Sequence, residues 1–227
     1  MIVAVHQPQY LPGLGYFDKI DRADVFVLLD TVQYKKSEWQ NRNRIKAADG
    51  WQWLTVPVTY KFPQRINEVV INNRDRWQHQ HRQAILSNYR KAPCWKSLVL
   101  FLEEILTPTW EYLAPLNIFV IRKLAAILGI ATPLYVASEL PVFPEDPDER
   151  LIAIVKHFGA DTYLAGSGGR DYMDLDRYAQ SGIEVLFQEY HHPVYEQQFG
   201  AFEPFMSVLD LLFNHGQESL RILRGKG

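Results

Sequence analysis

The sequence predicts an α/β protein with a Rossmann-like parallel sheet of about five strands and a hairpin-plus-helices insertion after the second strand. Two observations predict this class. Short apolar runs at residues 2–5 and 25–29 are separated by a loop and one helix-length segment, which is the spacing of a βαβ unit. The last third of the chain again alternates strand and helix patterns. We therefore expect a single α/β domain over residues 1–227, with the insertion at about 31–130.

The first unit and the insertion account for the elements up to Gly129. We expect a strand at residues 2–5, a helix at 14–22 and a strand at 24–30. Asp49-Gly50 is a strong turn signal, so the next segments should pair as a hairpin, followed by a short strand at 68–71. Three helices should follow, with Asn73 as the N-cap of the first and Gly129 as the C-cap of the last, at residues 74–89, 95–106 and 110–128.

The remaining segments complete the parallel sheet. We expect strands at residues 134–137, 162–165 and 183–187. Helices should occupy residues 148–158, 172–180 and 206–213, and a charged helix should begin at Gln217. Alternating strands and helices of this kind favour a sheet covered on both faces.

Composition narrows the class of protein. The chain is 47% hydrophobic and 22% charged, with a net charge of −2 and a pI of about 6.4, which disfavours nucleic acid as a partner. No apolar run reaches the roughly 18 residues of a membrane span, and the N-terminus lacks a signal-peptide pattern, so we expect a cytoplasmic protein. The lone Cys94 excludes an internal disulfide and a cysteine-based zinc site, and we expect it not to be catalytic. The sequence indicates no metal, and it leaves the cofactor and the oligomeric state unknown.

The loop after the first strand is the first candidate site. His6 ends the strand and is suited to acid–base catalysis or to phosphate binding, with Gln7 and Tyr10 as substrate contacts. Pro8 and Pro12 restrict the backbone of this loop and so hold it in place. The alternative is a hydrogen-bonded histidine in a structural loop.

The second candidate site follows the second strand. Asp30 stands where many α/β enzymes keep a catalytic carboxylate, a metal ligand or a ribose partner. Strand alternation would place Arg42 and Arg44 on one side of the hairpin, where two guanidinium groups suit a phosphate. The other expected substrate contacts in this segment are Gln33, Tyr34, Lys35, Trp39, Asn41 and Asn43. The alternative is a solvated hairpin edge guarded by charge.

A glycine-rich turn is the third candidate site. Gly166, Ser167, Gly168 and Gly169 follow a strand and precede an expected helix. Exposed backbone N–H groups at a helix start favour an anion, although plain turn chemistry explains such glycines equally well. Because parallel strands end at one edge of a sheet, we expect His6, Asp30 and Gly166 to lie along the same edge.

Several long motifs resemble the WbqC-like proteins. The first block reads H-Q-P-Q-Y-L-P-x-L-G-Y-F-x-K-I, followed by A-D-V-F-V-x-x-D-x-V-Q-Y and W-Q-N-R-N-R-I-K. Late segments, Y-L-A-G-S-G-G-x-x-Y-M-D and F-x-P-F-M-S-V-L-D-L-L-F-N-H-G, resemble the same family, so the likeness spans nearly the whole chain. Gly13 departs from the pattern, which often has tryptophan there. The resemblance implies a transferase for an activated sugar or acyl donor, in bacterial surface-polysaccharide or related biosynthesis.

A weaker resemblance links the opening strand, loop, helix and strand to the nucleotidylyltransferase superfamily. The paired histidines of the H-x-G-H motif are absent, and Tyr16 falls near the second of them. The resemblance therefore implies a related plan of the fold rather than nucleotidyl transfer.

Three hypotheses for function follow. The first is a group-transfer enzyme with a phosphate-bearing substrate, in which His6 and Asp30 are catalytic and Arg42, Arg44 and Lys35 neutralise negative charge. The second is a non-catalytic binding protein for a nucleotide-linked sugar or a carrier. The third is nucleic-acid binding by the basic segment at 35–46 with stacking tryptophans, against which the acidic pI counts.

Overall fold

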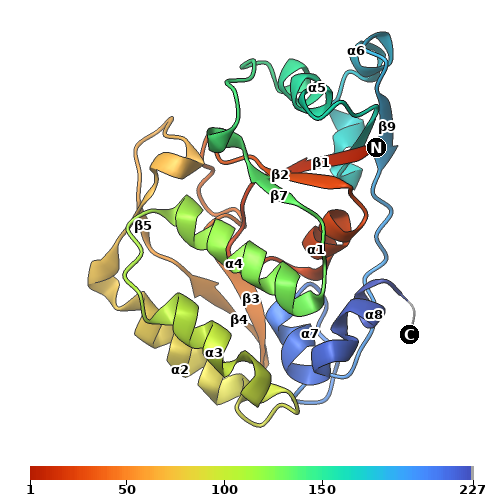
Figure 1. Cartoon of the computed structure of the whole chain (residues 1–227). Coiled ribbons are helices and arrows are strands. Elements are labelled where there is room, and N and C mark those ends of the chain that lie inside the picture. Colours follow the sequence, from red (N-terminus) through yellow and green to blue (C-terminus); the bar gives the residue numbers. More distant parts are fainter. Residues whose placement is uncertain (226–227) are drawn as a thin grey trace.

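The computed structural model describes residues 1–225 and contains a five-stranded parallel sheet (Figure 1). The strands lie in the order β7-β2-β1-β8-β9. Their bounds are Leu134–Val136, Val25–Leu28, Ile2–His6, Thr162–Ala165 and Glu184–Phe187, in that spatial order. The predicted fold class is confirmed.

Both faces of the sheet are covered, which explains why β1 and β2 are continuous apolar runs. Successive side chains alternate between faces, so Val3 and Val5 belong to one hydrophobic cluster while Ala4 belongs to the other. The helices α5 (Pro147–His157) and α6 (Leu175–Gln180) cover the first of these faces. Figure 1 shows them above the sheet.

The opposite face packs against helices from the beginning, the middle and the end of the chain. These helices are α1 (Leu14–Asp21), α4 (Leu113–Leu128) and α7 (Val208–His215), which lie below the sheet in Figure 1. The short helix α8 (Ser219–Leu223) falls within the charged tail predicted from Gln217, whose last two positions, 226–227, lie outside the described residues. No helix within residues 1–225 is long and apolar enough to span a membrane.

The insertion contains the predicted hairpin, β3 (Arg42–Ala47) and β4 (Gly50–Thr55). A second small pair, β5 (Val58–Thr59) and β6 (Val70–Ile71), follows it. The helices α2 (Trp77–Tyr89) and α3 (Trp95–Leu106) complete the insertion.

Three predicted helix starts are wrong by three residues. The helix α4, predicted from residue 110, begins at Leu113. The helix α2 begins only after Arg76, whose φ of 48° breaks the helical path, and Asn72 rather than Asn73 accepts a backbone N–H there. The helix predicted from residue 172 begins at Leu175, because residues 167–171 form a short 3₁₀ turn. Gly129 does end α4 in the left-handed region, with a φ of 81°, as expected for a C-cap.

The chain reverses its direction across the sheet between β1 and β8. From β1 it passes to β2 through α1 on one face, and it later reaches β8 through α5 on the other face. The two connections therefore leave a crevice beyond the carboxyl ends of β1 and β8. In open α/β sheets such a switch point is the usual place for a ligand.

Candidate functional site

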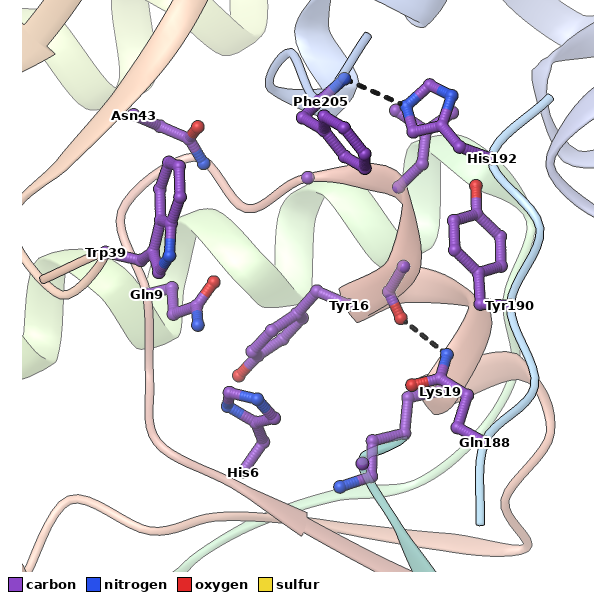
Figure 2. Close-up of a pocket in the computed structure, with 14 residues that line it drawn as sticks. His6, Gln9, Tyr16, Lys19, Trp39, Asn43, Gln188, Tyr190, His192 and Phe205 are labelled. Atoms are coloured by element: carbon purple, nitrogen blue, oxygen red, sulfur yellow. Dashed lines mark hydrogen bonds between the residues drawn. The ribbon is translucent and has the colours of Figure 1, made fainter. Parts of the chain in front are cut away.

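A pocket of about 270 Å³ opens at this switch point (Figure 2). Its walls come from the end of β1 and the following loop, from α1, from the hairpin region, from Gly166 after β8 and from the segment after β9. Figure 2 shows Trp39, Gln9 and Asn43 on one side, Gln188 and Tyr190 on the other, and His6 and Lys19 at the base. The strand registers align His6 with Leu28 and Ala4 with Leu164. His6, Asp30 and Gly166 therefore lie along one edge, as the sequence predicted.

His6 presents one free ring nitrogen. Its Nδ1 lies 3.2 Å from the carbonyl oxygen of Gln7, which can only accept, so Nδ1 donates and Nε2 keeps a lone pair. The ring packs edge-on against Tyr16, with 4.9 Å between centroids. Burial, together with the charge of Lys19, lowers the pKa of His6 to about 4. The ring is therefore neutral at neutral pH.

Lys19 is a buried amine that lacks an acidic partner. Its side chain is only 3% exposed, and no carboxylate within residues 1–225 forms an ion pair with it. Nζ donates to the carbonyl oxygen of Val5 at 2.9 Å and lies 5.9 Å from the centre of the Tyr163 ring. Burial lowers the pKa of this lysine to about 7. A titratable group with such a shift, in a cleft at the ligand edge, is typical of a functional site.

Sequence reasoning did not single out Lys19. The feature of the sequence that points to Lys19 is its position three residues after Tyr16 on α1, which places both side chains on one helix face. Helical side chains lean toward the N-terminus, and the N-terminus of α1 is the end that carries pocket residues. A lysine on that face therefore points back toward the strand ends.

Amide side chains fix both sides of the pocket. Gln188 donates to the carbonyl oxygen of Gly15 at 2.8 Å and to Oδ2 of Asp18 at 2.7 Å, which leaves its own Oε1 for a ligand. Asn43 donates to the carbonyl oxygen of Leu11 at 2.7 Å, so it joins the hairpin to the first loop. These contacts hold both sides of the pocket in a defined position before a ligand binds.

Tyr190 supplies a further polar group. Its ring packs so closely on α1 that a Cβ at Gly15 would lie 3.1 Å from Cδ1 of the tyrosine. The hydroxyl is buried and has no hydrogen-bond partner within residues 1–225. Burial raises the pKa of Tyr190, so the hydroxyl remains a donor at neutral pH. Buried polar groups are usually paired, and this unpaired one belongs to a residue that lines the pocket.

Four of the predicted site residues line the pocket: His6, Trp39, Asn43 and Gly166. The rest of the glycine-rich turn does not join them. Ser167 and Gly168 are exposed, and Gly169 is buried where an added Cβ would lie 2.8 Å from Sδ of Met173.

Asp30 lies at the predicted edge but outside the pocket lining. It is 2% exposed and accepts the backbone N–H of Ser138 at 3.0 Å and the Ser138 hydroxyl at 2.6 Å. These contacts connect the end of β2 to the turn after β7. The described contacts of Asp30 therefore support the backbone near the site.

Other predicted contacts form the frame behind the pocket. Gln7 accepts from Gln40 at 2.6 Å, and the buried Tyr10 hydroxyl lies 3.0 Å from Nδ1 of His81. Asn41 donates to the carbonyl oxygen of Val56 at 2.9 Å. Tyr34 packs on Tyr60 in the core, whereas Gln33 and Lys35 are exposed.

The hairpin carries Arg42 and Arg44 on one side, as their alternation predicted, and both lie outside the pocket lining. The Arg42 guanidinium lies 4.3 Å from the centre of the Trp53 ring. Arg44 lies 4.9 Å from Trp51 and 5.7 Å from Trp39. Trp39 also lines the pocket, so these arginines and tryptophans lie next to it.

The strand order and the switch-point pocket define a Rossmann-like α/β protein with a pocket at the carboxyl edge of its sheet. The chain belongs to the WbqC-like protein family, whose model matches residues 7–222, so the predicted membership is confirmed. It is 37% identical over 226 residues to Rv1507c of Mycobacterium tuberculosis, described as an uncharacterized protein, with 98% of this chain and 97% of that protein covered. No solved structure matches the chain.

Proposed function

We propose that this protein is a group-transfer enzyme that acts on a phosphate-bearing activated substrate, such as a nucleotide-linked sugar or an acyl donor. The observation that carries the proposal is the Lys19 amine, which lines the switch-point pocket, has no carboxylate partner within residues 1–225 and has a pKa of about 7. Bacterial surface-polysaccharide or related biosynthesis, in the cytoplasm where activated donors are made, belongs to the same proposal and is supported by the family.

The pKa values of Lys19 and His6 indicate different roles for these two basic groups. A general base works best when its pKa is near the operating pH, which suits Lys19 and not His6 with its pKa of about 4. Neutral Lys19 therefore takes the proton from the attacking hydroxyl or amine of the acceptor. His6 accepts a hydrogen bond through Nε2 from another donor of the bound substrate, such as a neighbouring hydroxyl, and orients it.

In the proposed transfer one bond forms and one bond breaks. The acceptor oxygen or nitrogen forms a bond to the activated carbon, while the bond from that carbon to the phosphate oxygen or thioester sulfur breaks. Once protonated, Lys19 is an ammonium beside the departing group, where its charge stabilises the negative charge that develops. The Tyr190 hydroxyl and the fixed amide of Gln188 are further groups for orienting the substrate. The proposal gives Asp30 no role in catalysis.

A thermal-shift screen of nucleotide-linked sugars, nucleoside diphosphates and acyl thioesters would identify the donor, since a ligand at 100 times its dissociation constant adds about 2.7 kcal/mol of stability. Turnover with a panel of hydroxyl and amine acceptors would then be followed by mass spectrometry. We expect Lys19→Met to abolish transfer and Lys156→Met, at an exposed lysine on α5, to leave it unchanged. Tight donor binding with no transfer to any acceptor would instead favour a non-catalytic binding protein.

A further inference from the structure

The β3–β4 hairpin presents an aromatic and cationic surface beside the pocket, made of Trp39, Trp51, Trp53, Arg42 and Arg44. The three indoles are 38%, 40% and 38% exposed, and they lie together rather than singly on the surface. They contact each other, with ring centroids 5.6 Å apart for Trp39 and Trp53 and 5.4 Å apart for Trp51 and Trp53. We call this set the tryptophan–arginine surface.

The two arginines keep hydrogen-bonding capacity for a ligand. Neither pairs with a carboxylate within residues 1–225, and the buried Nε of each has no partner there. Arg42 donates to the carbonyl oxygen of Ser37, and Arg44 reaches the carbonyl oxygen of Phe205 only at 3.4 Å. Stacking on indoles holds both guanidinium planes in place, which favours recognition of a phosphate.

The surface continues from the rim of the pocket. Trp39 and Phe205 both line the pocket, and Arg44 contacts both of them, with 5.7 Å to the ring of Trp39 and 3.4 Å to the carbonyl oxygen of Phe205. Trp51 and Trp53 do not line the pocket: Trp51 lies 4.9 Å from the guanidinium carbon of Arg44, and Trp53 lies 5.9 Å from it and 5.6 Å from Trp39. Trp39 and Arg44 therefore connect the pocket to these two outer indoles.

The pocket, the arginine beside it and the outer indoles match the three parts of one ligand class: a transferred group, a diphosphate and a base. We propose that the tryptophan–arginine surface binds the nucleoside diphosphate part of an activated donor, with the diphosphate at Arg44 and the base stacked on Trp51 and Trp53. The transferred group then enters the pocket toward Lys19 and His6. This inference rests on the proposed function and narrows its substrate class, because an acyl thioester without a base would not use the outer indoles.

An oligonucleotide carries the same chemistry of bases and phosphates. The net charge of −2 and the pI of about 6.4 favour a small nucleotide instead, since nucleic-acid binding depends on a broad basic surface. The purely structural alternative is that stacking only stabilises the hairpin. Variants must therefore be tested for binding as well as for stability.

The experiment is calorimetric titration of the full chain with the four common nucleoside diphosphates, inorganic pyrophosphate and a single-stranded oligonucleotide. The variants Trp53→Leu, Trp51→Leu and Arg44→Lys would be compared with two matched controls. Tyr135→Leu alters an exposed aromatic, 40% exposed, on the edge strand β7, and Arg90→Lys alters an exposed arginine at the end of α2.

We expect Trp53→Leu and Trp51→Leu each to weaken nucleoside diphosphate binding at least about fivefold while pyrophosphate binding changes less than about twofold. Arg44→Lys should weaken both ligands, because both present a diphosphate, and the two controls should weaken neither. Unchanged nucleotide affinity in both tryptophan variants, no nucleotide binding by the wild type, or much tighter binding of the oligonucleotide would each overturn the inference. If Lys19-dependent transfer from a donor without a nucleotide were then observed, the proposed function would stand and only the base site would fail.

Discussion

Replacing Lys19 with methionine should stabilise the protein at neutral pH, although it removes the central group of the proposed site. The folded chain binds the Lys19 proton only up to a pKa of about 7, whereas the unfolded chain binds it up to the ordinary value of 10.5. That difference corresponds to a cost of about 5 kcal/mol for keeping the ammonium buried, of which about 4 kcal/mol remains at pH 7. Losing the hydrogen bond to Val5 offsets about 1–3 kcal/mol.

The sign of the pH dependence follows from the same values. Between pH 7 and 10.5 unfolding takes up a proton, so wild-type stability rises with pH in this window. Lys19→Met lacks this contribution, so its advantage should shrink by about 2 kcal/mol between pH 7 and pH 9. Urea unfolding of both proteins at the two pH values measures the difference directly. A variant that is less stable than wild type by the same amount at both pH values would refute the reasoning, and Lys156→Met is the control for loss of an exposed charge.

Three further outcomes are expected. Ser138→Ala removes a hydrogen bond to the buried Asp30 carboxylate, so the free energy of unfolding should fall by about 1.5–3 kcal/mol. Calorimetry should find donor affinity unchanged. Reduced affinity at unchanged stability would mean that Asp30 acts in the site. Gly15→Ala places a Cβ 3.1 Å from the Tyr190 ring, so it should weaken donor binding with a small effect on melting temperature, and equal affinities would show that the ring moves freely. Cys94→Ser should keep full transfer activity, because this thiol lies outside the pocket lining; lost turnover in a normally folded variant would contradict this.

Patterns of burial made most of the fold predictable. The strands β1 and β2 read as continuous apolar runs because both faces of the sheet are covered. The helix α3 and the strand β8 have the predicted bounds, since their ends coincide with clear turn and glycine signals. The start of α2 was missed because Arg76 adopts a left-handed conformation that its sequence neighbourhood does not encode.

The candidate site was predictable only in part. Strand ends pointed to His6 and Gly166, because topology brings the ends of parallel strands together. Lys19 was missed, since exposed and buried lysines on a short helix look alike in the sequence, and only the packing of α1 against β1 and β8 buries this one. The partner of Asp30 was equally hidden, because Ser138 lies 108 residues away in sequence.

The most direct test of the account is a crystal structure of the protein with the best donor from the thermal-shift screen. The central claim is that the switch-point pocket between β1 and β8 is the reactive site. We predict that the leaving-group phosphate or thioester will lie within hydrogen-bonding distance, about 3 Å, of Nζ of Lys19, with the transferred group facing Nε2 of His6. An ordered donor bound elsewhere on the molecule, with this pocket holding only solvent, would contradict the claim.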